Sequence, residues 1–263
     1  MAGNGRMKSP NISSAGPGCR ETKSIFLRSL ALQASWNPLR MQHMGLLAAL
    51  IPWVRRLDMG KKEVRRFCRD HYGYFNTNPY LANYLIGGLI RLEENRRNGE
   101  NIDQKRIVLF KETLGRALAS LGDQLFWLGL QPAILMIGVL FAFAGLPAGV
   151  LAPVALFSVW QLVLRYRAIG DGYRLGIDIV DLLSSPVWHR AIHTLKRVGA
   201  VLTGVCAAWV VYGTGELVVT DNGHGAALGL VMTAGLALWA RRRLPGEAVV
   251  LLLVPLALAL SYL

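Results

Sequence analysis

QLFWLGLQPAILMIGVLFAFAGLPAGVLAPVALFSVWQLVL occupies residues 124–164, and its 41 consecutive positions hold no Lys, Arg, Asp or Glu. A membrane-crossing helix needs about 20 apolar residues, so this stretch is long enough to cross a bilayer twice. Near its middle, Gly145-Leu146-Pro147-Ala148-Gly149 interrupts the run with helix-breaking residues. The stretch therefore predicts an all-α integral membrane protein with multiple transmembrane helices, in which residues 124–164 form a helical hairpin.

The composition agrees with a membrane protein and excludes two other classes. Of the 263 residues, 53% are hydrophobic and only 17% are charged, whereas soluble proteins carry about 25% charged residues. That balance excludes an ordinary soluble enzyme, and the high hydrophobicity excludes a disordered chain. The first 125 residues hold 20 Lys and Arg against 10 Asp and Glu. Because no nucleic-acid-binding motif accompanies this charge, we expect no nucleic-acid partner and interpret it as a basic cytoplasmic flank.

The basic residues also predict which parts of the chain face the cytoplasm. Lys and Arg are frequent between residues 165 and 197, so both ends of the hairpin should lie on the cytoplasmic side. Charge-poor segments at 198–215, 223–240 and 248–263 predict further crossings. The loop with Glu216 and Asp221 should lie outside, and Arg241–Arg243 inside. The pattern predicts a multi-pass protein whose N-terminus is cytoplasmic.

The predicted organisation is a tail followed by one membrane domain. Residues 1–22, rich in Gly, Ser, Pro and Asn, predict a flexible cytoplasmic tail. The membrane domain, residues 23–263, divides into four parts: an amphipathic or re-entrant part (23–123), the hairpin (124–164), a cytoplasmic loop (165–197) and C-terminal spans (198–263). Three scattered cysteines without a Cys-x-x-Cys spacing indicate neither a disulfide framework nor a zinc site.

Residues 23–123 leave two interpretations open. Met41–Val54 and His71–Ile90 carry no Asp, Glu, Lys or Arg, but each contains a Pro and several polar residues. Such segments suit re-entrant or interfacial helical hairpins, or alternatively a cytoplasmic helical domain that packs these faces internally. Asp58–Arg69 predicts a basic amphipathic helix, lying either on anionic lipid or in solvent. Asp103 is a predicted N-cap.

Three polar motifs lie beside these segments. Ser35-Trp36-Asn37-Pro38 and Phe75-Asn76-Thr77-Asn78-Pro79 combine amides with an aromatic ring, as sugar sites do, although Asn-Pro also simply marks turns. Asp123, at the start of the hairpin, either N-caps the following helix or faces a polar pathway.

No motif predicts catalysis. Phosphate-loop, GxSxG and HExxH patterns are absent from the sequence. His189 and His193 share one helical face but lack a third ligand, so we predict no metal site. The sequence favours binding and transport over an enzyme, with no cofactor.

Several motifs in one order resemble those of enzyme IID, a membrane subunit of phosphotransferase-system permeases of the mannose/fructose/sorbose family. The matching stretches begin with Leu32-Gln33-Ala34-Ser35-Trp36-Asn37-Pro38 and continue with His71-Tyr72-Gly73-Tyr74-Phe75-Asn76-Thr77-Asn78-Pro79, Leu92-Glu93-Glu94 and Leu121-Gly122-Asp123-Gln124-Leu125-Phe126-Trp127. Asn78 stands where the family usually has His, and residues 115–123 replace a run richer in Gly and Pro.

The resemblance implies a subunit of the bacterial cytoplasmic (inner) membrane that pairs with enzyme IIC in a hetero-oligomer. The pair would translocate a mannose-type hexose, while cytoplasmic IIA and IIB subunits relay phosphate and the D subunit is not itself phosphorylated. The candidates for the sugar site are Trp36, Asn76, Thr77 and Asp123. An alternative is a transport-deficient protein of the same fold that acts with IIC as a sensor or scaffold, which the altered run at 115–123 favours.

The predicted topology is testable by cysteine labelling. A single cysteine introduced at Gly223 should react with a membrane-impermeant maleimide from outside, whereas one at Ser184 should react only after permeabilisation, because short basic loops stay cytoplasmic. External inaccessibility of the Gly223→Cys protein would contradict the topology.

Overall fold

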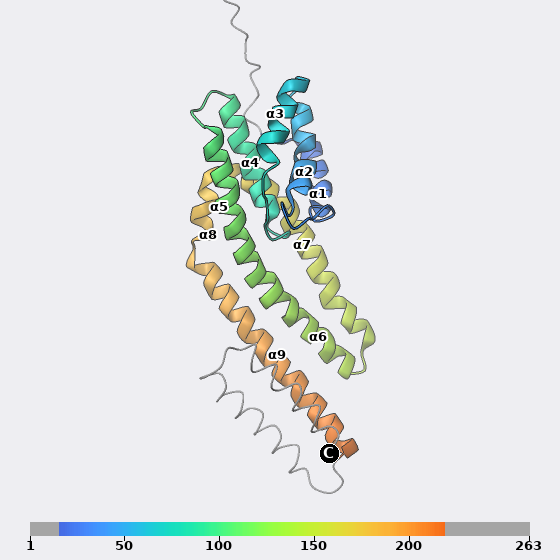
Figure 1. Ribbon diagram of the computed structural model, residues 1–263. Coiled ribbons are helices and arrows are strands. Elements are labelled where there is room, and N and C mark those ends of the chain that lie inside the picture. The colour runs from blue at the N-terminus through green and yellow to red at the C-terminus, as the bar shows by residue number, and fades with distance from the viewer. Residues whose placement is uncertain (1–15, 219–263) are drawn as a thin grey trace, which may run out of the picture. The chain divides into compact units, whose positions relative to one another are not determined.

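The computed structural model describes residues 16–218 (Figure 1). In this part the elements are helices, with two isolated β-bridges as the exception, so the all-helical prediction is confirmed. They are α1 (Cys19–Leu30), α2 (His43–Arg56), α3 (Lys61–His71), α4 (Ala82–Arg97), α5 (Gln104–Gly122), the π-helix η1 (Asp123–Leu130), α6 (Gln131–Phe143), α7 (Pro147–Leu175), the 3-10 helix η2 (Gly176–Asp178), α8 (Ile179–Leu183) and α9 (Pro186–Val218).

The chain forms two compact units, residues 1–199 and 200–263. Helices α1 to α8 and the first part of α9 belong to the first unit. The predicted crossing at 198–215 falls within α9, which continues to Val218. The predicted crossings at 223–240 and 248–263, and most of the predicted tail, lie outside the described residues.

Helix α4 is the most deeply buried element of the first unit. Its consecutive residues from Leu85 to Ile90 are all buried, and α2, α5 and α7 pack against it. The apolar face of the predicted segment 71–90 is therefore covered by protein side chains. Such packing is expected both of a cytoplasmic helical domain and of a re-entrant segment surrounded by protein.

The hairpin begins in a continuous helical run. Helix α5 leads through η1 into α6, and the chain then reverses at Gly145, whose φ is +72°. Helix α7 begins with Pro147 at its first position, where proline's fixed φ suits a helix start and its missing N–H costs nothing. The structure thus turns within the five-residue interruption that the sequence shows.

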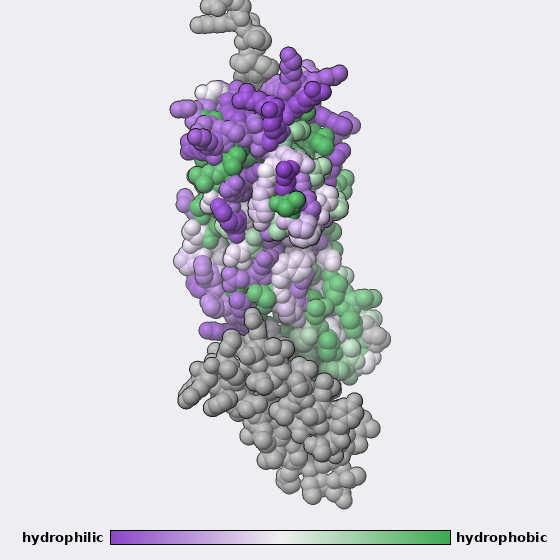
Figure 2. All heavy atoms as spheres, viewed as in Figure 1, coloured by the Kyte–Doolittle hydropathy of each residue, from purple (hydrophilic) through white to green (hydrophobic). Residues whose placement is uncertain are grey.

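Long apolar side chains cover the hairpin. Two helical runs, Gln104–Phe143 and Ala148–Leu183, are long and apolar enough to cross a membrane. In the second run, only 6% of the most apolar 18-residue window is buried inside the protein. Figure 2 shows this hydrophobic surface on the part of the molecule where α6 and α7 lie, and a hydrophilic surface at the opposite end, near α3. A helix so apolar and so little buried needs lipid or another protein around it.

Two local predictions in the first half can be checked directly. Asp103 caps α5, because its Oδ1 accepts a hydrogen bond of 2.9 Å from the backbone N–H of Arg106, so that prediction is confirmed. The basic helix begins at Lys61 rather than Asp58, since Asp58 has a φ of +46°, which a right-handed helix does not accommodate.

Helices α4 and α7 approach each other through two glycines. A methyl group at Gly87 would overlap the carbonyl oxygen of Ile169, and one at Gly172 would overlap the carbonyl oxygen of Tyr84. The two backbones are therefore in contact, as they are where small residues line helix pairs in membrane proteins. This contact fixes the distance between the two helices.

Replacing either glycine should separate the helices. Gly87→Ala and Gly172→Ala should each lower the free energy of unfolding by about 1–3 kcal/mol, the usual cost of overpacking. Gly170→Ala is the matched control, because Gly170 lies in the same helix with open space where a Cβ would stand. Thermal unfolding of the purified protein tests this, and equal midpoints for all three variants would contradict the close contact.

Candidate functional site

Two loops that carry predicted polar motifs meet beside the first turn of α2. Met41 forms an isolated bridge with Phe75, and the backbone N–H of Gln42 donates to the carbonyl oxygen of Phe75 at 2.8 Å. The Gln42 carboxamide then binds Thr77 twice: Nε2 donates to the Thr77 carbonyl oxygen at 2.8 Å, and Oε1 accepts from the Thr77 N–H at 3.1 Å. Gln42 thereby holds the 72–81 loop against the start of α2. The stretch that resembles the family's opening motif extends to Gln42, but it predicts no role for this side chain.

Asn78 connects the same loop to the helical run of α5 and η1. Its Oδ1 accepts from the backbone N–H of Tyr80 at 3.0 Å, and its Nδ2 donates to Asp123 Oδ1 at 2.9 Å. Gly122 packs against Asn78, and a side chain at position 122 would overlap the Asn78 carboxamide. The Gly-Asp pair of the 121–127 motif therefore has a physical reason: the glycine leaves room for Asn78, and the aspartate accepts its hydrogen bond.

Asp123 is not the N-cap of the following helix. It has right-handed helical backbone angles and is the first residue of the π-helix η1, inside a run that is helical on both sides. The N-cap alternative for Asp123 is therefore wrong. A π-helix is uncommon and often marks a functional position, and here it presents an exposed carboxylate next to the 72–81 loop.

Thr77 and Asn76 bring free polar groups to this junction. Thr77 is buried, and its hydroxyl has no hydrogen-bond partner in the described part of the protein. A buried hydroxyl without a protein partner is rare and usually faces water or a ligand. Asn76 is half-buried, with its backbone oxygen against Gly115 of α5.

Trp36 has no hydrogen bond or ring contact with Asn76, Thr77 or Asp123 among those found in the described residues. Trp36 lies in the turn after α1, with about half of its surface exposed, and its backbone N–H donates to Gln33. Other aromatic rings follow Asp123 in the chain: Phe126 and Trp127 lie on the same π-helix, and the Tyr80 ring lies 4.6 Å from the first and 5.7 Å from the second. Trp127 is also exposed. The sequence indicates that Trp127 lies near Asp123, because the two residues are four positions apart in a predicted helix.

The Leu92-Glu93-Glu94 motif forms a separate polar network at the other end of α4. Glu94 accepts hydrogen bonds from Trp53 Nε1 at 2.8 Å and from the Tyr173 hydroxyl at 2.6 Å, and it also pairs with Arg56. Glu93 is equally buried and lies between two partners, His71 at 2.8 Å and Arg96 at 2.7 Å. Both carboxylates are fully engaged, so we interpret this network as structural.

The altered run at 115–123 lies mostly outside the junction. Arg116 is exposed and forms an ion pair with Glu112 one turn away. Ala117 and Ser120 line a different pocket of about 290 Å³, together with His189 and His193. Within residues 16–218, no group of three His, Cys, Asp or Glu side chains could hold a metal ion.

Comparisons with known proteins agree on one family. Residues 19–237 match the family model described as "PTS system mannose/fructose/sorbose family IID component". The mannose-specific EIID component of Escherichia coli (strain K12) is 38% identical over 161 residues, which are 61% of this chain and 57% of that protein. The sorbose-specific EIID component of Klebsiella pneumoniae is 30% identical over 182 residues, 69% of this chain and 66% of that protein. The match thus spans little more than half of the E. coli protein's length.

Solved structures extend the similarity over most of the chain. A protein described as "Structure of membrane protein" has a TM-score of 0.71 at 26% identity, covering 92% of this chain and 96% of that one. The "CryoEM Structure of Mannose Transporter ManYZ and Microcin E492 (MceA) complex" contains a chain with a TM-score of 0.58, also at 26% identity, covering 92% and 95%. The predicted integral membrane fold is therefore confirmed.

The bonds between Gln42 and Thr77 predict a stability effect. Gln42→Leu removes both partners of the buried Thr77 backbone groups, and each such group costs about 1–3 kcal/mol when unpaired. We expect the free energy of unfolding to fall by about 2–4 kcal/mol and protease cleavage within residues 72–81 to accelerate. Gln33→Leu, at an exposed glutamine, is the control and should change neither. If both variants unfold alike, Gln42 does not hold the loop.

Proposed function

This chain belongs to the mannose/fructose/sorbose family of phosphotransferase-system IID components, and from that premise we propose that it pairs with a IIC subunit to translocate a mannose-type hexose. In this proposal the sugar is phosphorylated by a IIB subunit as it reaches the cytoplasm. This chain positions the sugar and is neither phosphorylated nor catalytic. The E. coli relative is named for mannose, and one similar structure is described as a mannose transporter, which supports a hexose as the substrate.

The main support for a sugar site is the hydrogen bond between Asn78 and Asp123, together with the unpaired hydroxyl of the neighbouring Thr77. It brings a loop before α4 to a π-helix at the base of the hairpin, and leaves polar atoms there without protein partners. Sugar hydroxyls both donate and accept hydrogen bonds. The free oxygen of Asp123, the Thr77 hydroxyl and the Asn76 carboxamide would together match such a ligand, because a carboxylate accepts, a hydroxyl does both, and an amide offers both groups.

An aromatic ring beside these groups would cover the C–H face of a pyranose. We assign this role to Trp127, which is exposed and lies on the same π-helix as Asp123. The ring of Tyr80 supports it at 5.7 Å. Trp36, the residue that the motif alone proposed, belongs to a different loop.

Two surfaces of the first unit support the proposed partner and orientation. The exposed apolar side chains of α6 and α7 offer a IIC subunit, together with lipid, the hydrophobic environment that they need. The opposite end carries the basic residues of α3, with Arg96 and Arg97 in the last turn of α4 and Lys105 and Arg106 in the first turn of α5. Its charge favours a cytoplasmic position with a cytoplasmic N-terminus, where IIA and IIB subunits would meet it.

The alternative, a transport-deficient sensor or scaffold, rested on the altered residues 115–123. Arg116 points away from the junction into an exposed ion pair, and Ala117 and Ser120 line another pocket. These positions therefore leave the Asn78–Asp123 junction intact, which favours transport over the alternative. Sugar uptake and phosphorylation by the reconstituted subunits would separate the two.

Substitutions in the junction should weaken sugar binding without preventing assembly. Asn76→Ala and Asp123→Asn each leave a sugar hydroxyl unpaired, at a cost of about 1–3 kcal/mol, or roughly 5- to 150-fold in affinity. Asn at position 123 still accepts the hydrogen bond from Asn78, so the local fold should survive. The measurement is sugar affinity of the purified complex, with assembly followed by size-exclusion chromatography.

A further variant tests the aromatic part of the site, and three variants serve as controls. Trp127→Leu should weaken sugar binding, whereas the control Trp36→Leu should not. His189→Ala and His193→Ala should leave affinity near normal, because both histidines are exposed and lie in the other pocket. If the Asn76 and Asp123 variants assemble and bind sugar like the parent, the junction is structural and the proposed site is wrong.

A further inference from the structure

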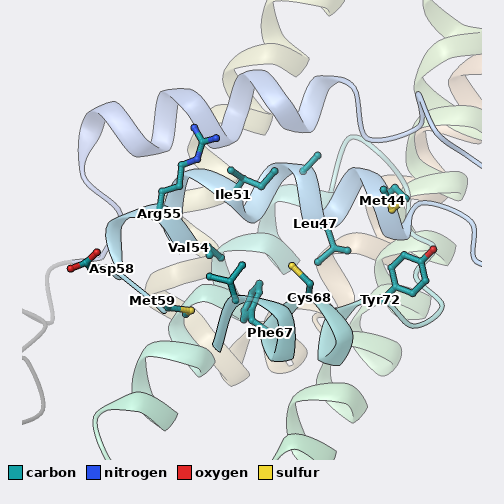
Figure 3. A pocket seen from close by; sticks show the side chains of 12 residues that line it. Met44, Leu47, Ile51, Val54, Arg55, Asp58, Met59, Phe67, Cys68 and Tyr72 are labelled. Carbon is teal, nitrogen blue, oxygen red and sulfur yellow. The ribbon is translucent and has the colours of Figure 1, made fainter. Parts of the chain in front are cut away.

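An open apolar groove of about 660 Å³ runs between α2 and α3. Figure 3 shows Leu47 and Val54 of α2 pointing toward Phe67 and Cys68 of α3. The opposite face of α2 is the one that packs in the protein core, where Leu46, Leu50 and Trp53 are fully buried. The groove side of α2 is only partly covered, and Met44 at one end remains exposed. The groove thus presents apolar side chains that no described part of the chain fills.

The charges around α3 differ between its two sides. On the side that faces α4, cations are paired: Arg97 with Glu63, Arg66 with Asp70 and Arg96 with Glu93. On the groove side, helical spacing places Lys61 and Arg65 next to Val64 and Cys68. Neither of these two cations forms an ion pair with any described residue.

The ends of the groove also carry charged and aromatic groups. Arg55 lines it from the last turn of α2 and is likewise exposed without an ion pair among the described residues, while Asp58 lies three positions later. At the opposite end, the Arg40 guanidinium stacks over the Tyr72 ring at 4.4 Å. Cations thus outnumber the single carboxylate around an apolar floor, and an occupant with a negative head and an apolar body would complement both.

We propose that this groove binds an acyl chain of an anionic phospholipid, whose phosphate is held by Lys61, Arg65 and Arg55. A fatty acyl chain is long and flexible enough to follow an open groove between two helices. Its burial there removes apolar surface from water. The uncompensated cations distinguish an anionic headgroup from a zwitterionic one, since each Lys or Arg near an anionic surface strengthens binding appreciably. An apolar helix of another subunit would fill the same groove without needing those charges.

Cys68 provides a direct readout of groove occupancy. It lines the groove and is exposed, as is Cys19 on α1, so Cys19 serves as an internal control in the same molecule. The full chain, with any subunit that co-purifies, is reconstituted in phosphatidylcholine vesicles with or without phosphatidylglycerol. Alkylation of each cysteine by a maleimide is then followed by peptide mass spectrometry. Phosphatidylglycerol should slow alkylation of Cys68 several-fold, by about three to ten times if the groove is mostly occupied, and leave Cys19 unchanged.

Two variants separate the headgroup from the acyl chain. Lys61→Gln with Arg65→Gln should weaken the protection by phosphatidylglycerol on the order of tenfold in lipid concentration. Lys105→Gln with Arg106→Gln is the matched control, because these exposed residues lie on α5, outside the groove. Ala48→Phe places a ring in the groove, where Ala48 is a lining residue, and should abolish crosslinking of residues 44–72 to a phosphatidylglycerol with a diazirine at its acyl terminus.

Three results would overturn the proposal. If Cys68 is alkylated at the same rate in vesicles with and without phosphatidylglycerol, the groove has no preference for an anionic lipid. Crosslinks outside residues 44–72 alone would place the lipid elsewhere. Protection of Cys68 by a co-purified subunit in the absence of phosphatidylglycerol would assign the groove to a protein helix. None of these outcomes depends on sugar binding, so the proposed transport function stands or falls separately.

Discussion

The backbone contact between α4 and α7 is the constraint on which the rest of the first unit depends. Because Gly87 and Gly172 have no side chains, the two helices lie against each other's carbonyl groups. Only at that separation does the Asn83 carboxamide reach the carbonyl oxygen of Arg165 at 2.7 Å. The same separation brings the Tyr173 hydroxyl to Glu94 at 2.6 Å. One close contact thus satisfies polar groups that burial would otherwise penalise.

The two ends of α4 use this rigidity differently. At its C-terminal end, the buried carboxylates of Glu93 and Glu94 have donors from three other helices, and removing one partner of a buried charge is costly. At its N-terminal end, the loop that contains Thr77 and Asn78 is held by Gln42 yet retains an unpaired hydroxyl. A buried hydroxyl without a protein partner marks a place where water or a ligand is expected.

The sequence predicted the features that local composition determines. The charge-free run, its Gly-Pro interruption and the Asp103 cap all depend on neighbouring residues, and the structure has the hairpin turn and the cap at those places. It did not predict contacts between residues far apart in the chain, such as Glu94 with Tyr173. Nor did it predict the π-helix at Asp123, for which the residue types give no signal. The altered run at 115–123 favoured a transport-deficient protein, but Arg116 within it is exposed and forms an ion pair with Glu112 one turn earlier on α5.

The sequence resemblance leads one to expect His at position 78, and Asn78 differs from His in its response to pH. An imidazole has two ring nitrogens whose donor and acceptor roles depend on the tautomer, and it gains a charge near pH 6.5. The Asn78 carboxamide donates to Asp123 and accepts from the Tyr80 N–H at the same time, and it stays neutral. The connection between the 72–81 loop and the π-helix is therefore independent of protonation at residue 78. Its shorter side chain also matches the close approach of Gly122, so the loop lies against the helix through a neutral, fixed pair of hydrogen bonds.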